Sequence, residues 1–553
     1  MEKPDKEFTI QEALDMAVDH HRAGRLSEAN NIYRLILDKL PNQPVALNLN
    51  GVILHQSGNS ISAINQIKKA IESNPNYVDA HLNLGTVLMD LNRFEEASEC
   101  FSLATNIDPN HSIAFNNLGN AKFKMYQYED AVVDYEKAIA LDPLCIEAYT
   151  NMGVLFKEEG ELETALKYIQ KAININPENI NSLNNYGAIL SDLRQYEEAE
   201  DSYKKALSID PNNIGVIGNY AILLNIIGKK ELSLSFFSKR LDLARGKYVD
   251  NLDLPQFKYI SKSKIKHDIE QFQFLKSTYK GDVRFENLVD IYSKLDKEIT
   301  WPANDAEWVL LSKSQRERIA DSYNRSVHIA YAPEISGGAL NKNLDAVAIT
   351  KNYFENKPGI AFFDNFLNAL ALKKLRQYFM ESTIWYDFSY SGGYLGAMYT
   401  DGVACPLLLQ IAEELRKVFP KIIKDHPLVQ MWAYKYDSQL KGINNHADIA
   451  AVNVNFWITP DVANTNPKSG GIIIHKAEAP LDWNFNSFNR DEEQIKKFLN
   501  QNQSGNIKVP YAENRMVLFN SNLIHKTDNI AFKTGYENRR INITMLFGNR
   551  VNN

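Results

Sequence analysis

Small and apolar residues recur with a period of 34 residues through the first 213 positions of the chain. Prolines follow this period at Pro41, Pro75, Pro109, Pro143, Pro177 and Pro211, and glycines follow it at Gly51, Gly85, Gly119, Gly153 and Gly187. Alanines keep the same register in two further columns, from Ala29 to Ala199 and from Ala70 to Ala206. Proline disfavours helix at the residue before it, and small residues let neighbouring helices approach closely. The period therefore predicts helical hairpins that must stack to bury their apolar faces.

This pattern resembles the tetratricopeptide repeat. We count six repeats from residue 10 to residue 213. A seventh unit, 214–247, keeps Ala221 and Phe237 but has Ser233 and Arg245 in place of an alanine and the proline, as expected of a capping unit. The sequence thus predicts an N-terminal all-α superhelix of repeats over residues 8–247.

One column of asparagines lies two positions before the small residue of each unit, at Asn83, Asn117, Asn151, Asn185 and Asn219. A side-chain amide both donates and accepts hydrogen bonds, so amides lining a groove can bind the backbone of an extended protein or peptide. Alternatively, these amides pair only with neighbouring helices. Both interpretations stay open at the level of sequence.

Residues 248–350 lose the repeat and predict a helical connector. The segments 262–279 and 312–331 have apolar residues at a spacing of three to four, which indicates amphipathic helices. Residues 331–343, YAPEISGGALNKN, predict a loop. The neighbouring pair His267 and Asp268 is interpreted as part of a solvated helix surface.

From residue 351 to 553 the pattern changes to that of a mixed domain. Helices are predicted at 366–381 and 405–419, followed by short alternating runs at 429–436, 449–459, 471–477, 515–520 and 540–547. Short strands bounded by proline and glycine are typical of a sandwich or barrel. We therefore expect an α+β domain with a double-stranded β-helix (jelly roll) at its core.

Two histidines and one aspartate in this domain have the order of a metal-binding triad. His446 and Asp448 precede the strand at 449–459, and His525 ends the predicted strand run NRMVLFNSNLIH. Two imidazoles and one carboxylate hold Fe(II) on one face and leave positions open for further ligands. A shared first-row metal requires His525 to lie within about 6 Å of Asp448. His475, within an apolar run, is interpreted as a core residue.

Arg540, Asn542 and Thr544 share one face of the last predicted strand. An arginine can hold a carboxylate through two parallel hydrogen bonds. We expect Arg540 to bind the far carboxylate of 2-oxoglutarate, with Asn542 assisting.

The triad and the arginine make residues 358–550 resemble the Fe(II)/2-oxoglutarate-dependent dioxygenases, nearest to their prolyl-hydroxylase-like branch. The stretch MWAYKYDSQLKGINNHAD is similar to the segment that leads into the triad in that branch. The resemblance implies a hydroxylase that uses Fe(II), O2 and 2-oxoglutarate and releases succinate and CO2, with ascorbate as a further candidate cofactor. It also implies that Tyr436, or Tyr434 on the same face, bonds the cosubstrate carboxylate.

The sequence departs from this branch in two ways. The branch usually places a lysine about ten residues after the distal histidine, whereas here Lys533 follows His525 by eight residues and Arg540 follows it by fifteen. In addition, residues 478–512 form an insertion, for which we expect a helix and a loop over the mouth of the site.

Composition narrows the possible partners. The 553 residues are 44% hydrophobic and 23% charged, as in a folded protein, and the net charge of −7 argues against binding to nucleic acid. No apolar run is long enough for a membrane span, and three distant cysteines suit a cytoplasmic location. We therefore expect an oxygenase whose repeats recruit a protein or peptide substrate. The alternatives are an interaction scaffold with an inactive jelly roll, or an oxygenase of a small molecule or glycan.

Overall fold

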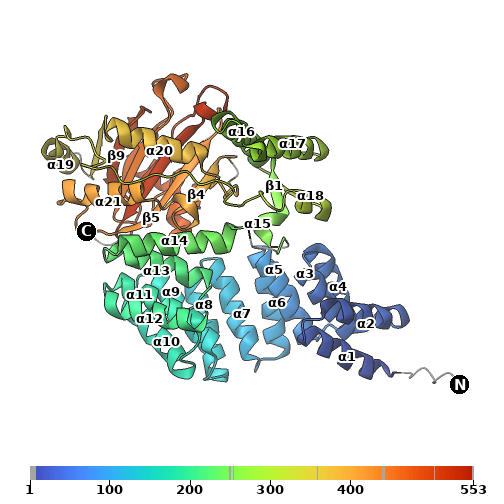
Figure 1. Cartoon of the computed structure of the whole chain (residues 1–553). Helices are drawn as coiled ribbons and strands as arrows, with labels where there is room; N and C mark the ends of the chain where they lie inside the picture. The colour runs from blue at the N-terminus through green and yellow to red at the C-terminus, as the bar shows by residue number, and fades with distance from the viewer. Residues whose placement is uncertain are drawn as a thin grey trace. The chain divides into compact units, whose positions relative to one another are not determined.

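The computed structural model describes residues 8–247, 251–252, 254–355, 357, 359–390, 392–438, 442–503 and 505–550 (Figure 1). It contains two compact units, Met1–Leu193 and Arg194–Asn553. The first unit holds most of the predicted array, and the second holds its last helices together with the sheet-containing region. The predicted domain boundaries at residues 247 and 350 stay predictions.

The first unit is built from paired helices, as the 34-residue period predicts. Its helices are α1 (Ile10–Arg22), α2 (Leu26–Lys39), α3 (Pro44–Gln56), α4 (Ser60–Ser73), α5 (Val78–Asp90), α6 (Phe94–Ile107), α7 (Ser112–Lys124), α8 (Tyr128–Leu141), α9 (Ile146–Glu158), α10 (Leu162–Ile175) and α11 (Ile180–Asp192). A β-carbon at Gly85 would lie 2.5 Å from the ring of Phe101 on the partner helix. The glycine column therefore exists because the two helices of a hairpin touch there.

The second unit begins with α12 (Tyr196–Ile209), α13 (Ile214–Ile226) and α14 (Lys230–Arg245). It continues with α15 (Pro255–Lys258), β1 (Tyr259–Ser261), α16 (Lys262–Thr278), α17 (Val283–Glu298), β2 (Trp308–Leu310) and α18 (Lys313–Arg318). The prediction of a helix over 312–331 is wrong beyond Arg318. There Asn324 adopts a positive φ of 51° and donates to the carbonyl of Gln256 at 2.7 Å, so side-chain bonds to distant backbone replace the helical ladder.

The rest of the second unit combines helices with two sheets. Its elements are α19 (Ala346–Glu355), β3 (Ile360–Phe363), α20 (Ala369–Glu381), β4 (Leu395–Met398), α21 (Pro406–Val418), β5 (Leu428–Tyr436), β6 (Val452–Trp457), β7 (Ile472–Glu478), α22 (Phe485–Asn489), α23 (Glu492–Asn502), β8 (Asn506–Val509), β9 (Met516–Asn520), β10 (Leu523–Thr527) and β11 (Arg540–Phe547), with short turns η1 (Tyr399–Val403), η2 (Asp461–Ala463) and η3 (Tyr536–Asn538). A six-stranded sheet has the order β3-β9-β6-β11-β5-β4 and a three-stranded sheet the order β10-β7-β8. Neither sheet closes on itself.

The two faces of the six-stranded sheet have different neighbours. On one face, Phe456, Leu518 and Ile543 belong to the same apolar core as residues of α20 and α21, which cover the sheet in Figure 1. On the other face, Val517 and Phe519 share an apolar cluster with residues of the three-stranded sheet. The predicted site residues of β5 and β11 lie on this second face, between the two sheets.

The run NRMVLFNSNLIH is not one continuous strand, although the predicted strand at 515–520 coincides with β9. It divides into β9 and β10, which belong to different sheets. At the break, the side chain of Asn520 accepts a hydrogen bond from the backbone N–H of Asn522 at 3.0 Å, which closes a tight turn.

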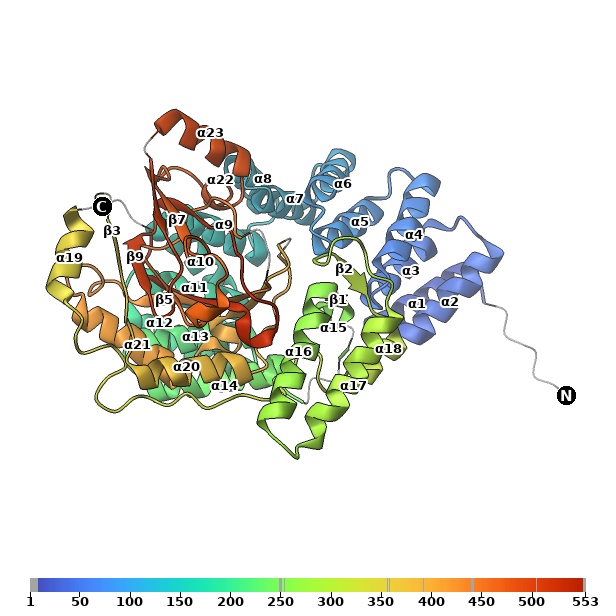
Figure 2. The same cartoon turned by 90° about the horizontal axis from the view of Figure 1, so that it is seen from above.

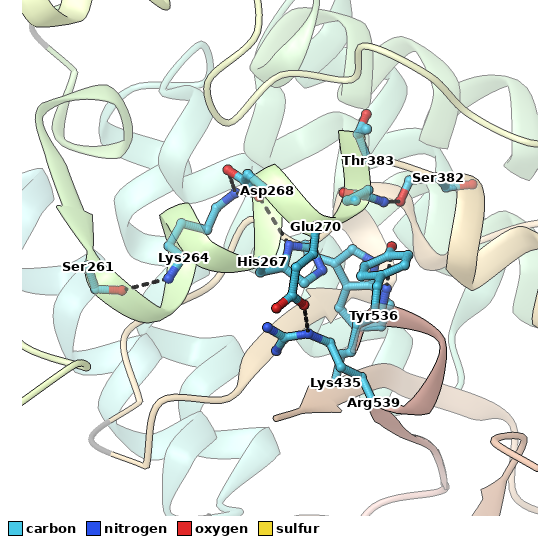
Figure 3. A network of polar contacts seen from close by, with 12 residues as sticks. Ser261, Lys264, His267, Asp268, Glu270, Ser382, Thr383, Lys435, Tyr536 and Arg539 are labelled. Atoms are coloured by element: carbon cyan, nitrogen blue, oxygen red, sulfur yellow. Dashed lines mark hydrogen bonds and ion pairs between the residues drawn. The ribbon is translucent and has the colours of Figure 1, made fainter. Parts of the chain in front are cut away.

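The prediction of a solvated His267–Asp268 pair is wrong, because both residues are buried. Asp268 accepts hydrogen bonds from Lys264 Nζ at 2.6 Å and from His267 Nδ1 at 3.1 Å (Figure 3). Beside them, Arg539 Nε donates to Glu270 at 2.7 Å. Burial, and then the nearby positive charges, lower the pKa of His267 well below its usual range, so its ring is neutral. Charge pairing within the network replaces the lost contact with water.

Candidate metal centre

The three predicted metal ligands come together at one end of the two sheets. His446 and His525 form a short antiparallel bridge with reciprocal backbone hydrogen bonds of 2.9 and 2.8 Å. Their Nε2 atoms lie 3.9 Å and 3.4 Å from the carboxylate oxygens of Asp448, well inside the 6 Å that we required. All three potential ligand atoms lie within 4.8 Å of one another. Residues 79 positions apart thus face a single point because two strands pair there.

The backbone fixes the orientation of both imidazoles. His446 Nδ1 lies 2.8 Å from the carbonyl of Asn444, and His525 Nδ1 lies 2.9 Å from the carbonyl of Leu523. A carbonyl only accepts, so each Nδ1 carries the proton and each Nε2 presents a lone pair toward Asp448. Burial, and then the neighbouring His525, lower the pKa of His446 to about 4. The His446 ring is therefore neutral, which is the form of imidazole that binds a metal.

Asp448 is held by a row of polar side chains on the inner face of the larger sheet. Asn453 donates to its carboxylate, Asn455 donates to Asn453, and Thr544 donates to Asn455 at 2.8 Å. Burial alone would raise the pKa of Asp448, but the nearby imidazoles of His525 and His446 and the hydrogen bond from Asn453 bring that pKa below its usual range. The carboxylate is therefore ionised and ready to act as a ligand.

Arg540 lies deep between the sheets and is only 2% exposed. Its Nε donates to the carbonyl of Gly470 at 2.7 Å, and its Cζ lies 4.9 Å from the ring centre of Tyr436 and 5.6 Å from that of Trp457. Its Nη1 is buried and has no hydrogen-bond partner among the described residues. A buried cationic donor without an acceptor can accommodate the oxygen of an anion. Lys533, the lysine nearest to the position that the prolyl-hydroxylase-like branch uses, is exposed to solvent.

The other predicted cosubstrate residues differ in their surroundings. Tyr436 is buried beside Arg540, and burial raises its pKa, which keeps the phenol protonated as a donor. Tyr434 accepts or donates a hydrogen bond with Tyr390 at 3.2 Å. Asn542 Nδ2 donates to both Asn455 and Thr544, at 3.0 and 3.1 Å. In this orientation Asn542 has no N–H left for a carboxylate, and its assistance to Arg540 stays a prediction.

The insertion contains α22, α23 and β8 (Figure 2), and its helices bond the backbone around the triad; its predicted place over the mouth of the site stays a prediction. The backbone N–H of Ala447, between the two ligands, donates to the carbonyl of Phe488 at 2.8 Å. The carbonyl of Ala447 accepts from Asn489 Nδ2 at 2.9 Å. Asn444, whose carbonyl orients His446, also bonds Glu492 of α23 through its side chain. The insertion therefore supports the backbone that carries two of the ligands.

Sequence reasoning missed some of these partners. The alternation of β6 indicated that Asn453 and Asn455 share a face with the site, but not that Asn453 holds Asp448. Nothing in the sequence pointed to Asn489, because its contact with Ala447 joins segments 42 residues apart. His475 Nε2 bonds the side chain of Asn445 at 3.0 Å and lies outside the triad.

The asparagine column in the first unit makes contacts between repeats. Asn83 Nδ2 donates to Asn48 at 3.1 Å, and Asn151 Nδ2 donates to Asn116 at 3.0 Å. All five column residues, Asn219 in the second unit included, are partly exposed. Two of the amides thus pair with neighbouring helices, as the alternative interpretation held, and binding of a peptide by the column stays a prediction.

Comparison with known proteins identifies the repeats. Models of the tetratricopeptide repeat match residues 54–118, 112–144 and 144–212. The repeats are tetratricopeptide repeats. Such repeat scaffolds support interactions with proteins and peptides. The matches do not extend to the sheet-containing region.

Solved structures give partial similarities. MamA is 28% identical, and the match covers 29% of this chain and 94% of that chain with a TM-score of 0.27. Pseudomonas aeruginosa pilF is 21% identical over 39% of this chain and 96% of its own, with a TM-score of 0.32. YrrB, described as a TPR protein with an unusual peptide-binding site, is 21% identical over 34% and 94%, with a TM-score of 0.26. Because these TM-scores are low, the assignment of the repeats as tetratricopeptide repeats rests on the family models.

A search of curated proteins finds none that matches this chain. In the described part of the chain, no helix combines the length and apolar character needed to cross a membrane.

Proposed function

We propose that this chain is an Fe(II)/2-oxoglutarate-dependent hydroxylase whose tetratricopeptide repeats recruit a protein or peptide substrate. The observation that carries the proposal is the convergence of His446, Asp448 and His525, with both Nε2 atoms turned toward the ionised carboxylate. This donor set suits Fe(II) with open coordination positions.

The strand order supports a jelly roll as the scaffold of the site. Along the chain, β5 lies in the larger sheet, the His446 bridge extends the smaller sheet, and β6 returns to the larger one. β7 and β8 are again in the smaller sheet, β9 in the larger, β10 in the smaller and β11 in the larger. Alternation of successive strands between two packed sheets is characteristic of jelly rolls.

The residues present fit the metal and the cosubstrate. His446, Asp448 and His525 would hold Fe(II), and Arg540 with Tyr436 would hold the far carboxylate of 2-oxoglutarate. When bound, iron and 2-oxoglutarate supply the oxidising chemistry: O2 and 2-oxoglutarate give succinate, CO2 and a hydroxylated C–H bond of the substrate. The buried, unpaired Nη1 of Arg540 supports this fit, because a carboxylate would satisfy it.

The residues of the chain itself would bind the cosubstrate, orient the metal ligands and exclude water from the site. Gly470 fixes one edge of the Arg540 guanidinium, and the unpartnered Nη1 is left to donate to a carboxylate. Asn453 keeps Asp448 in place, and the backbone carbonyls of Asn444 and Leu523 keep both imidazoles in one tautomer. Side chains of both sheets around Trp457 and Phe519 shield the floor of the site from solvent.

Succinate release from 2-oxoglutarate by the full chain, with Fe(II), O2 and ascorbate, tests the enzymatic part. We expect turnover that His446→Ala with Asp448→Ala abolishes. His475→Ala is the matched control, because this histidine lies on the adjacent strand β7 outside the triad, and it should retain iron binding and turnover. Equal turnover in the triad variant, or none in the natural chain under any of these conditions, would favour the scaffold alternative.

The asparagine column allows a test of recruitment. Asn117→Ala with Asn185→Ala alters column amides whose N–H groups bond no residue in the described ranges. We expect this variant to lose binding of the native protein substrate while succinate release without that substrate stays unchanged. A substrate that binds the variant normally would indicate that the repeats serve another purpose, and full activity on a small molecule or glycan would support that alternative.

A further inference from the structure

A cavity of 560 Å³ in the second unit lies apart from the candidate metal centre. The end of α13, the start of α14, one face of α21 and the segment that leads into β5 line it. Its volume is in the range of small-molecule sites. Leu428 in its wall is eight residues from Tyr436 along β5, a separation of about 26 Å for an extended strand. This cavity is therefore not the cosubstrate site.

Positive charge predominates in its lining. Four cations, Lys230, Arg416, Lys417 and Lys424, face one carboxylate, Glu413. Glu413 already accepts hydrogen bonds from Lys417 and Lys230, the latter at 3.0 Å, and these bonds lower its pKa. Its charge is thus shared by two lysines. Arg416 and Lys424 are left without a carboxylate partner in the described part of the chain.

Arg416 carries the clearest sign of a missing partner. Its Nη2 donates to the carbonyl of Lys424 at 2.8 Å, whereas its Nε is buried and finds no acceptor among the described residues. The neighbouring His426 also experiences the positive charge of Arg416. Burial, and then the charges of Arg194 and Arg416, lower its pKa. A buried cationic donor beside an exposed lysine offers a place for an anionic acceptor from outside the chain.

Apart from Asn225, the rest of the lining has no polar side chain and includes Ile226, Leu409 and Leu428. A ligand that fills the cavity therefore needs an anionic head and an apolar body. A phosphate monoester carries about two negative charges near pH 7 and three terminal oxygens, which suits a guanidinium and an ammonium group together. We infer that this cavity binds a small organic phosphate, with its head at Arg416 and Lys424 and its body against Ile226 and Leu409.

Phenyl phosphate is a simple probe with both features. Titration calorimetry on the full chain at constant ionic strength should show saturable binding at one site. Inorganic phosphate should bind more weakly because it has no apolar body, and benzoate should bind more weakly because it has one charge. Arg416→Gln with Lys424→Gln should weaken binding by at least about tenfold. Lys421→Gln is the matched control, because Lys421 is exposed in the same turn and does not line the cavity.

Lys424→Gln alone, at an exposed position, should still weaken binding if the double variant does not fold. Equal affinity in these variants and in the natural chain would overturn the inference. So would the absence of saturable binding, or a signal that sodium chloride of the same ionic strength reproduces. Benzoate that binds as tightly as phenyl phosphate would overturn the assignment to phosphates. Because iron plays no part in this readout, the result is independent of the proposed hydroxylase activity.

Discussion

Replacement of Arg540 by methionine tests the cosubstrate site most directly. Methionine keeps an apolar stem beside Tyr436 and Trp457 but removes the positive charge and every N–H donor. Nε already bonds Gly470, so a bound carboxylate would use the two Nη groups. A hydrogen bond between charged groups contributes about 1.5–3 kcal/mol. The loss of two such bonds costs about 3 kcal/mol or more, which corresponds to a dissociation constant at least about 100-fold higher.

Calorimetric titration of 2-oxoglutarate into the Mn(II)-loaded protein without O2 measures this constant directly. Arg515→Met is the matched control, because Arg515 is paired with Asp364 at 2.6 Å, and it should leave the affinity unchanged. Arg540→Lys should give an intermediate affinity, since lysine keeps the charge but not the paired geometry. The reasoning fails if Arg540→Met binds 2-oxoglutarate as tightly as the natural chain. It fails equally if Lys533→Met, and not Arg540→Met, abolishes binding.

Three further changes test other parts of the molecule. Asn453→Ala removes a donor from Asp448 and should lower metal affinity by about tenfold or more in a metal-binding titration; unchanged affinity would exclude a supporting role for the amide. Asp268→Asn leaves the buried ammonium of Lys264 without its counter-charge and should lower the free energy of unfolding in urea by about 3 kcal/mol, and a change near zero would contradict the network. Glu200 has a pKa lowered to about 2 by two lysines and a tyrosine that outweigh its burial. The ionised carboxylate should contribute at most about 3 kcal/mol to the free energy of unfolding, fully above pH 4.5 and progressively less as the pH falls toward 2. In urea unfolding, the difference in stability between the natural chain and Glu200→Gln should therefore disappear over that interval.

The strands and helices that carry the site were largely predictable from the sequence. The 34-residue period sets the helical hairpins, because each hairpin needs the same small residues where its helices touch, as at Gly85 and Phe101. Alternation along 429–436, 449–459 and 540–547 predicted β5, β6 and β11, because a half-buried strand must separate its two faces. Prediction from the local pattern fails where contacts with distant segments decide the conformation. At Asn324, for example, a hydrogen bond to the backbone of Gln256 replaces the predicted helix.

The candidate site likewise has features that the sequence determined and features that only the fold determined. The sequence by itself determined the candidate ligand types, their order and the strand face that carries Arg540, because these follow from side-chain chemistry and a period of two. Only the tertiary structure decided that His446 pairs with His525, that Asn453 holds Asp448, and that Nη1 of Arg540 is buried without an acceptor among the described residues. These contacts depend on which strands become neighbours, and the burial of Arg540 depends on which side chains the packed sheets remove from water. Burial likewise turned His267 and Asp268 from a presumed surface pair into part of a core network, since only packing reveals which charges can compensate one another.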